Sequence, residues 1–289
     1  MVRVVSLFAA IGRRLPLRVN RAIGRFLGAL AFTILRSDRR KAMANVAIAF
    51  PDWTSIQRRQ TIRAMFAHLG MTLAEVMWLR NLDAEMLART TVIEGADATL
   101  QLIRDGRGVI AFTGHCGNWE WVARTVALLG MKLSALQRER DEPEMNQFIL
   151  DLRTNGGIKT IDRGSATSAR EMIGALRKGE MLAFLLDQNI RADSVKVPFF
   201  GKPALTPIGP AKLAIRAEVP VVCIFIARGD DGKQYVRFTD IIETKRDDDP
   251  VALTARITAE IEEQIRRVPA QWVWMHDRWR ERPKWDVTP

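Results

Sequence analysis

The amino-acid sequence predicts an α/β protein in which a mostly parallel mixed sheet is covered by helices on both faces. Short apolar runs at residues 109–112 and 181–186 are typical of buried strands. Stretches with apolar residues three and four positions apart alternate with these runs and predict helices. Because no long linker interrupts the series, we expect residues 37–289 to form a single α/β domain after a helical segment at residues 1–36.

The remaining elements follow from the same periodicities. Helices are expected at residues 54–79, 98–105, 143–153, 168–179, 206–217 and 252–267, and strands at residues 133–136, 219–227 and 235–238. A shorter basic helix is expected from residue 39 until Pro51 ends it. Ser168 and Glu171 have the spacing of a capping box.

The most informative stretch is residues 109–130, where a predicted strand leads through a glycine-containing loop into a helix. The loop holds His115, Asn118 can cap the helix, and Glu120 lies in its first turn. Ligands of open α/β sheets gather at the carboxyl ends of strands. An imidazole there can take a proton from an alcohol while a carboxylate fixes its tautomer, so His115 and Glu120 predict a general-base centre. A core or capping histidine is the alternative.

A second polar pair, Asp187 and Gln188, follows the predicted strand at residues 181–186. The ends of two strands in one sheet can converge, so Asp187 can orient His115 or bind an acceptor. The alternative is a structural ion pair with an arginine, because a buried acid needs a partner.

Motifs in a fixed order resemble those of the late acyltransferases of lipid A biosynthesis, within the wider glycerolipid and lysophospholipid acyltransferase superfamily. They are His115-Cys-Gly-Asn-Trp-Glu120, Asp187-Gln188, Phe200-Gly-Lys-Pro203 and Gln271-Trp-Val-Trp-Met-His-Asp-Arg-Trp279. The resemblance implies transfer of a fatty acyl chain from a thioester, with acyl carrier protein as donor, to a hydroxyl of a lipid A precursor. It implies no cofactor, gives Cys116 no catalytic role, and places Asp187 on the active-site face.

Several residues are candidates for binding substrate. The resemblance places an arginine after the predicted strand at residues 133–136, which follows the helix that contains Glu120. Either Arg138 or Arg140 can fill that position, because the local sequence matches the family pattern only loosely. Such an arginine can stabilise an oxyanion or hold a phosphate, or it can be a solvated surface charge. Lys202 lies in an apolar turn and can meet an anion. Asn118 and Gln188 complete the expected set.

The N-terminal segment is predicted to associate with a membrane. Its arginines occupy about 60° of a helical wheel, and its apolar residues lie opposite them. The arginines are Arg14, Arg18, Arg21 and Arg25. The apolar residues are Val19, Ile23, Phe26, Leu27, Leu30 and Ile34. No run approaches the roughly 18 apolar residues of a spanning helix. We expect a helix in the membrane interface with its arginines toward anionic headgroups. A helix packed on the domain with a solvated arginine stripe is the alternative.

Charge and composition restrict the partners. A formal net charge of +11 indicates an anionic membrane, an acidic carrier protein, a phosphorylated substrate or nucleic acid. The basic residues are spread along the chain without a nucleic-acid-binding motif, which argues against nucleic acid. The 3 histidines and 2 cysteines lack metal-ligand spacing, and so few cysteines fit a reducing compartment. With the resemblance, these features predict the cytoplasmic face of the inner membrane.

Two other interpretations remain open. An acyl-CoA-dependent acyltransferase acting on another membrane lysolipid or glycolipid would use the same chemistry. A basic membrane-surface or nucleic-acid-binding protein without catalysis would not need His115 and Glu120. Trp272 and Trp274 beside arginines fit a membrane interface or stacking on single-stranded nucleic acid.

Overall fold

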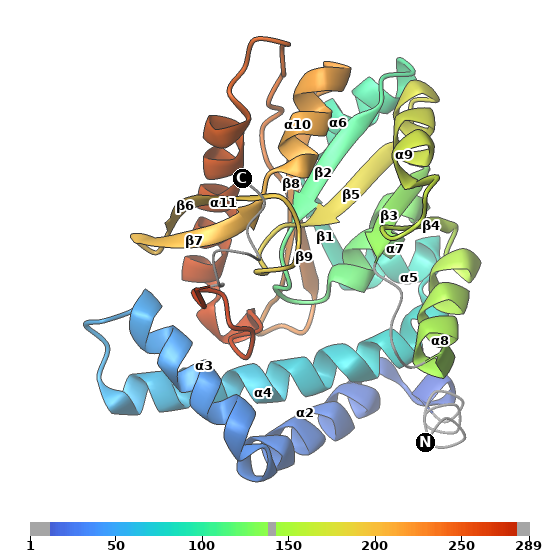
Figure 1. Cartoon of the computed structure of the whole chain (residues 1–289). Helices are drawn as coiled ribbons and strands as arrows, with labels where there is room; N and C mark the ends of the chain where they lie inside the picture. The colour runs from blue at the N-terminus through green and yellow to red at the C-terminus, as the bar shows by residue number, and fades with distance from the viewer. Residues whose placement is uncertain (1–11, 138–142, 282–289) are drawn as a thin grey trace.

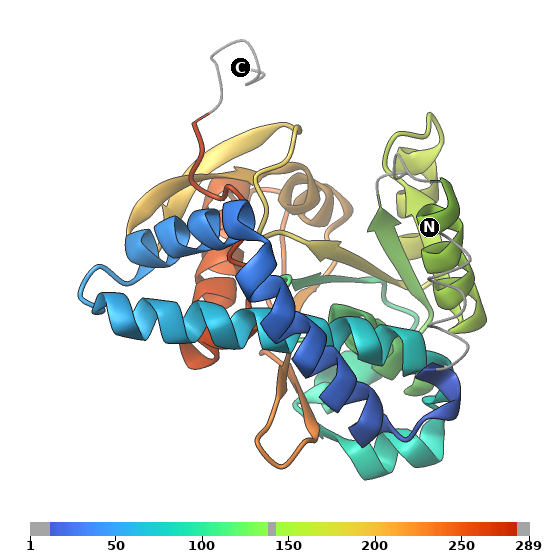
Figure 2. The same cartoon turned by 90° about the horizontal axis from the view of Figure 1, so that it is seen from below.

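The computed structural model describes residues 12–137 and 143–281 of the chain. A central sheet is flanked by helices, and a layer of three helices lies across one end of it (Figure 1). These helices are α2 (Leu17–Ile34), α3 (Arg36–Ala49) and α4 (Ser55–Trp78). Figure 2, seen from below, shows α2 crossing α4. The predicted α/β class is confirmed.

The seven-stranded sheet has the order β1-β9-β8-β2-β5-β3-β4. Its strands are β1 (Thr91–Glu94), β2 (Val109–Thr113), β3 (Leu133–Gln137), β4 (Ile158–Asp162), β5 (Met181–Leu185), β8 (Val221–Arg228) and β9 (Gln234–Phe238). Neighbouring strands are parallel except for β8 and β9, which pair antiparallel. The mostly parallel mixed sheet is therefore confirmed.

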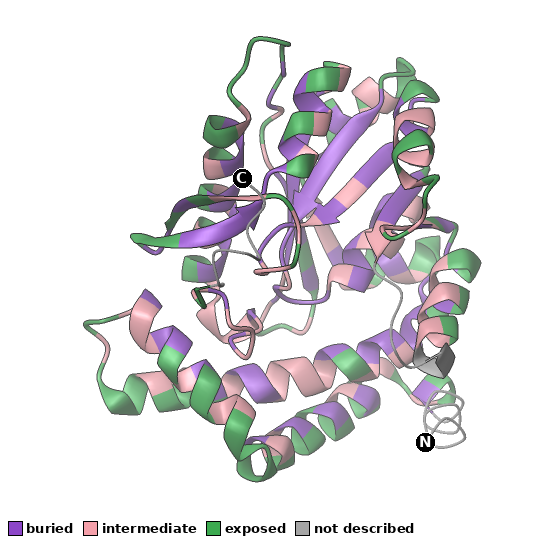
Figure 3. Ribbon diagram, viewed as in Figure 1, coloured by how far each residue is buried: buried purple, intermediate pink, exposed green. Residues whose placement is uncertain are grey.

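Helices cover both faces of this sheet, as predicted. The other helices are α5 (Ala84–Thr90), α6 (Ala96–Arg104), α7 (Trp119–Leu128), α8 (Pro143–Asn155), α9 (Ser168–Arg177), α10 (Gly209–Ala217) and α11 (Pro250–Arg267), with short 3-10 turns η1 (Leu79–Asn81) and η2 (Pro269–Gln271). Alternate residues of β2 enter two separate apolar cores: Ile110 and Phe112 pack with α10 and α11, and Val109 and Ala111 pack with α7. Figure 3 shows the buried strands between these layers.

One predicted helix begins later than expected. Residues 202–207 belong to a hairpin of β6 (Ser194–Phe199) and β7 (Lys202–Pro207), and α10 begins only at Gly209. The hairpin turns at Phe200 and Gly201, whose φ angles of 52° and 69° are both positive. Two successive positive φ angles suit a tight hairpin turn, but a phenylalanine gives no sequence signal for one.

The N-terminal helix packs on α4 through small residues. Gly24 and Gly28 of α2 lie so close to α4 that a Cβ atom at either would collide with its backbone. Arg21 turns toward α4 and pairs with Glu75 at 2.6 Å, so it is not part of a membrane-facing arginine stripe, contrary to the prediction. The predicted apolar residues of α2 face outward: Phe26 is 69% and Ile34 63% exposed. Within the described residues, no helix combines the length and apolar content of a transmembrane span.

The tryptophan-rich C-terminal stretch belongs to the core. Trp272 and Trp274 are buried, and their rings pack edge to face 4.6 Å apart. Arg278 is fully buried and donates hydrogen bonds to the Leu205 carbonyl and to the Thr206 hydroxyl. The interpretation of Trp272 and Trp274 as part of a membrane interface is therefore wrong.

Candidate active site

His115 and Asp187 meet at the edge of the sheet where β2 and β5 end. The two strands are adjacent and parallel, with Thr113 opposite Leu185, so the loops that follow them emerge side by side. Asp187 Oδ1 lies 2.8 Å from His115 Nδ1, and Asp187 Oδ2 accepts the His115 backbone N–H at 2.7 Å. The same oxygen accepts the indole N–H of Trp272 at 2.7 Å. Three hydrogen bonds thus fix a buried carboxylate against the histidine.

The charge of Asp187 determines the tautomer of His115. Burial alone would raise the pKa of Asp187, but the facing His115 and the hydrogen bonds from His115 and Trp272 lower it to about 2. An ionised carboxylate only accepts hydrogen bonds, so Nδ1 of His115 carries the proton. Nε2, on the opposite side of the ring, is left as a base. Trp119 packs edge-on against the imidazole at 4.9 Å and restricts its rotation.

Glu120 has a different partner. In the first turn of α7, its carboxylate accepts two hydrogen bonds from Arg153 of α8, at 2.6 and 3.1 Å. Arg153 also donates to the Gln137 side chain at the end of β3, at 2.8 Å. The contact that orients His115, which we expected from Glu120, is therefore made by Asp187. Glu120 and Arg153 form a second charged pair nearby.

Both pairs border one cavity of about 1420 Å³. His115, Glu120, Arg153 and Gln188 line its polar part. Its apolar lining comes largely from β3, β5, α9 and α10 and includes Leu136, Met172, Ile173, Phe184, Leu186 and Leu213. The basic residues Arg163, Lys212 and Arg216 also line it. A hydrocarbon chain and an anionic headgroup can therefore be accommodated beside the histidine.

The other expected substrate-binding residues lie elsewhere. Lys202 is exposed at the start of β7 and does not line the cavity. Asn118 is fully buried: its Oδ1 caps α7 by accepting the Trp121 N–H at 3.1 Å, and its Nδ2 donates to Glu75 at 2.9 Å. Its predicted capping role is confirmed, but direct substrate binding is wrong, because no part of the amide faces the cavity. Arg138 and Arg140 lie outside the described residues.

A buried ionic cluster that we did not predict supports the catalytic loop. Glu75 of α4 is fully buried and binds Arg21 of α2, Arg228 of β8, Gln234 of β9 and Asn118. Burial raises the pKa of Glu75, but the ion pairs, led by that with Arg228, lower it below its usual value. The available sequence signal was an acid beside an apolar residue, Val76, in a predicted helix, since a buried acid requires cationic partners.

The environment of the neighbouring cysteine disfavours the thiolate form that a nucleophile needs. Cys116 is buried beside His115, and burial raises the pKa of its thiol far above neutrality. A thiolate is the reactive form of cysteine. His115, held by Asp187, instead borders the cavity. Among the described residues, no group of histidine, cysteine and acidic side chains could hold a metal ion.

A strand-end histidine oriented by a buried carboxylate, above a cavity with apolar walls, is the arrangement expected of an enzyme that transfers acyl groups. The family model described as bacterial lipid A biosynthesis acyltransferase matches residues 2–281. The chain belongs to this family, and it is an O-acyltransferase.

Curated relatives cover most of the chain at modest identity. The lipid A biosynthesis palmitoleoyltransferase of Escherichia coli is 27% identical over 277 residues, covering 93% of this chain and 88% of the relative. The lipid A biosynthesis lauroyltransferase of the same organism is 27% identical, and the match covers 94% of this chain and 88% of the relative. The phosphatidylinositol mannoside acyltransferase of Mycobacterium tuberculosis is 27% identical, and the match covers 71% of this chain and 66% of the relative.

Among solved structures, the chain resembles the 1-acyl-sn-glycerophosphate acyltransferase of Thermotoga maritima. That match has a TM-score of 0.40 and 16% sequence identity, covering 87% of this chain and 99% of the other.

Proposed function

We propose that this enzyme transfers a fatty acyl chain from acyl carrier protein to a hydroxyl of a lipid A precursor at the cytoplasmic face of the inner membrane. The observation that carries the proposal is the pair of His115 and Asp187 at the polar end of a cavity with apolar walls. The family assignment supports the choice of acceptor class.

In the proposed reaction, Nε2 of His115 takes the proton of the acceptor hydroxyl as the hydroxyl oxygen attacks the thioester carbonyl. The imidazolium that forms is stabilised by the Asp187 carboxylate at 2.8 Å. The tetrahedral intermediate then collapses, the carbon–sulfur bond breaks, and the departing thiolate takes the proton from Nε2. The ester product, the free thiol and the original enzyme remain, so no covalent enzyme intermediate is needed.

Other residues are proposed to bind the substrates. Glu120 and Arg153 are proposed to position the acceptor, since both line the cavity beside His115. Gln188 is a candidate for the same role because it follows Asp187 and lines the cavity. Arg138 and Arg140 follow Gln137, which also lines the cavity, and one of them remains our candidate for the oxyanion or a donor phosphate.

We further propose that residues 1–36 attach the acyltransferase domain of residues 37–289 to the membrane. The support is the exposed apolar side of α2, which includes Ile23, Phe26, Leu30 and Ile34. Leu73 of the adjoining α4 is also exposed, at 56%. Transfer of exposed apolar surface of this kind into the interface of a bilayer lowers the free energy. Arg14, Arg18 and Arg25 are exposed on the same segment and can meet anionic headgroups.

A second candidate is an acyl-CoA-dependent acyltransferase acting on another membrane glycolipid. It is favoured by one observation, the similarity to a phosphatidylinositol mannoside acyltransferase. Such an enzyme would use the same base and the same cavity.

One experiment separates these candidates. Purified enzyme is given acyl carrier protein or CoA thioesters of the same acyl chain, with a lipid A precursor or a mannosylated glycolipid as acceptor, and the products are identified by mass spectrometry. We expect ester formation on the lipid A precursor from the carrier-linked donor. Transfer only from CoA, and only to the other glycolipid, would establish the second candidate instead.

A further inference from the structure

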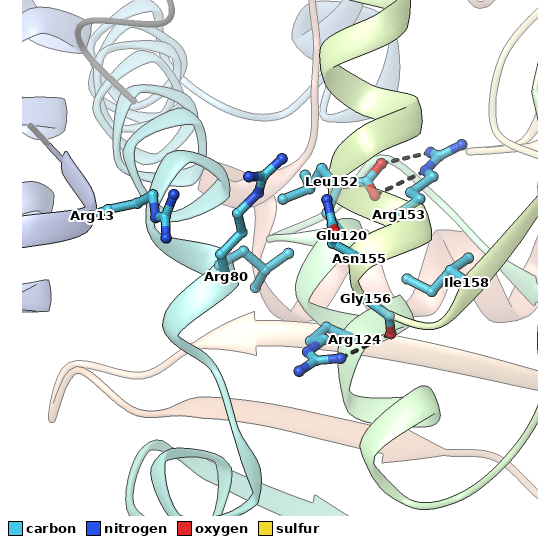
Figure 4. A pocket seen from close by; sticks show the side chains of 10 residues that line it. Arg13, Arg80, Glu120, Arg124, Leu152, Arg153, Asn155, Gly156 and Ile158 are labelled. Carbon is cyan, nitrogen blue, oxygen red and sulfur yellow. Dashed lines mark hydrogen bonds and ion pairs between the residues drawn. The ribbon is translucent and has the colours of Figure 1, made fainter. Parts of the chain in front are cut away.

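A smaller pocket of about 220 Å³ adjoins the catalytic cavity (Figure 4). The two spaces share Glu120 and Arg153, which line both. The small pocket lies where η1 meets α7 and α8, at the end of the helical layer formed by α2 and α4. None of its lining residues comes from α9 or α10, which supply apolar walls of the catalytic cavity.

The pocket concentrates positive charge. Besides Arg153, it is lined by Arg13, Arg80 and Arg124. Its acidic residue, Glu120, is already neutralised by the two hydrogen bonds from Arg153. Among the described residues, no carboxylate forms an ion pair with Arg13, Arg80 or Arg124. Within the described part of the chain, the lining thus carries three positive charges without a counterion.

The three arginines enter from separate parts of the chain. Arg13 precedes α2, Arg80 lies in η1, and Arg124 lies in α7. Arg124 is held in place by neutral backbone partners, donating to the carbonyls of Leu82 at 3.0 Å and Gly156 at 2.9 Å. Arg13 and Arg80 are exposed and lie on the opposite side of the pocket in Figure 4. Like charges gathered around a concave site repel one another unless an anion occupies it.

The chemistry of this arrangement selects for phosphate. Guanidinium groups bind phosphate oxygens through paired, charge-assisted hydrogen bonds, and several together can surround one phosphate. The pocket is too small for an acyl chain, and its charged lining is unsuited to one. Its connection to the cavity through Glu120 and Arg153 allows one molecule to occupy the pocket while another of its groups reaches His115.

We infer that Arg13, Arg80 and Arg124 bind a phosphate group on the headgroup of the lipid acceptor and so place the acceptor hydroxyl at His115. This inference rests on the proposed function. The acceptor is favoured over the donor because the apolar cavity walls that would hold the donor's acyl chain lie toward α9 and α10, away from the pocket.

The test compares Arg13→Gln and Arg80→Gln with wild-type enzyme. Both side chains are exposed and lack ion pairs within the described chain, so their replacement should preserve the fold, which thermal unfolding checks. Arg104→Gln, an exposed arginine on α6 that lines neither space, is the matched control. Steady-state kinetics are measured with a phosphorylated acceptor and with the same acceptor after enzymatic dephosphorylation.

We expect each variant to raise the KM for the phosphorylated acceptor about tenfold or more, as for loss of a charged hydrogen bond. The KM for the donor should be unchanged, and the variants should equal wild type on the dephosphorylated acceptor. Inorganic phosphate should compete with the acceptor in wild type and much less in Arg80→Gln. A rise in the donor KM alone would assign the pocket to a donor phosphate and overturn the inference, as would unchanged kinetics.

A binding measurement separates this inference from the proposed reaction. Radiolabelled phosphorylated acceptor is bound to the His115→Ala protein, which should not transfer acyl groups, with and without Arg80→Gln. Weaker binding in the double variant supports the pocket even if wild-type enzyme uses a different donor or acceptor hydroxyl. Equal binding overturns it, whatever the reaction proves to be.

Discussion

Arg153 holds both carboxylate oxygens of Glu120, through hydrogen bonds of 2.6 and 3.1 Å between α8 and α7. The pair is largely buried, with side-chain exposures of 11% for Arg153 and 7% for Glu120. It stands between the catalytic cavity and the arginine-lined pocket and is shared by both. The pair therefore links the position of α8 to the shape of both spaces.

Breaking this pair should destabilise the fold as well as slow the reaction. Glu120→Gln leaves the Arg153 charge uncompensated, which costs about 3 kcal/mol for a buried pair, whereas Glu120→Gln with Arg153→Met should recover part of the loss. Denaturant unfolding of the two single variants and the double variant gives the coupling energy. A coupling energy near zero would show that the pair does not act as a unit. Acyl transfer by Glu120→Gln should fall less than in His115→Ala.

Asp187→Asn should lower kcat with little change in either KM. Asparagine cannot enforce the proton on Nδ1 or stabilise an imidazolium, and the corresponding loss in a serine-protease triad is about 10⁴-fold. We expect a fall of at least about 10³-fold in single-turnover acyl transfer. Asp97→Asn, an exposed acid on α6, serves as the control. If Asp187→Asn kept a tenth of wild-type kcat, Asp187 would not be the orienting residue.

Stability should fall as the pH is lowered from 6.5 toward 4 because of His68. Burial, and then the charge of Arg228, lower the pKa of His68 from 6.5 to about 4, and its Nδ1 lies 2.9 Å from the Arg228 guanidinium. The unfolded chain takes up a proton below pH 6.5 that the folded protein binds only near pH 4. This contribution to stability is therefore complete above pH 6.5 and is lost as the pH falls.

The expected slope is up to about 1.4 kcal/mol per pH unit for one proton. Urea unfolding at several pH values, with His68→Gln for comparison, measures it. Glutamine retains an acceptor for Arg228 but does not titrate. An identical pH dependence in the two proteins would assign the slope to other groups.

Membrane binding should depend on the exposed apolar side of α2. Deleting residues 1–36 would remove Arg21 from the buried Glu75 cluster and damage the fold, so a point charge is the cleaner change. Phe26→Glu should reduce binding to anionic vesicles about tenfold or more, since burial of a large apolar side chain contributes about 1.5–3 kcal/mol. Turnover on detergent-dispersed substrate should change little.

The matched control for this change is Val251→Glu, which alters an exposed apolar residue of α11 with 38% exposure. Vesicle flotation compares the two variants. Equal losses in both, or no loss in Phe26→Glu, would place the membrane contact elsewhere.

The parts of the structure that could be predicted are those that local patterns encode. Apolar runs identified β2 and β5. Because ligands gather at the carboxyl ends of strands, His115 and Asp187, which follow these strands, could be predicted to meet at one edge of the sheet. The partner of Glu120 could not be found this way, because Arg153 reaches it from another helix and sequence spacing carries no such information. Asn118 was assigned two roles, and only the local one, helix capping, was correct.

Elsewhere, tertiary packing outweighed the local signal. Trp272 and Trp274 beside arginines are consistent with a membrane interface or with a core, and the choice depends on Phe199 and Phe200 of the β6–β7 hairpin packing against them. That hairpin was missed because its turn uses a phenylalanine at positive φ. Lys202 was misplaced for the same reason, since it begins β7 rather than a turn facing the site.

Turnover by His115→Ala tests whether His115 is the general base of acyl transfer. Acyl carrier protein thioester and a lipid A precursor are incubated with wild-type enzyme, His115→Ala and His68→Gln, which lies outside the cavity. Product is quantified by mass spectrometry, and thermal unfolding verifies that each variant is folded. We predict that His115→Ala loses about 10²–10⁴-fold or more in rate, while His68→Gln remains active near neutral pH. Folded His115→Ala enzyme that kept more than about a third of wild-type turnover would contradict the account.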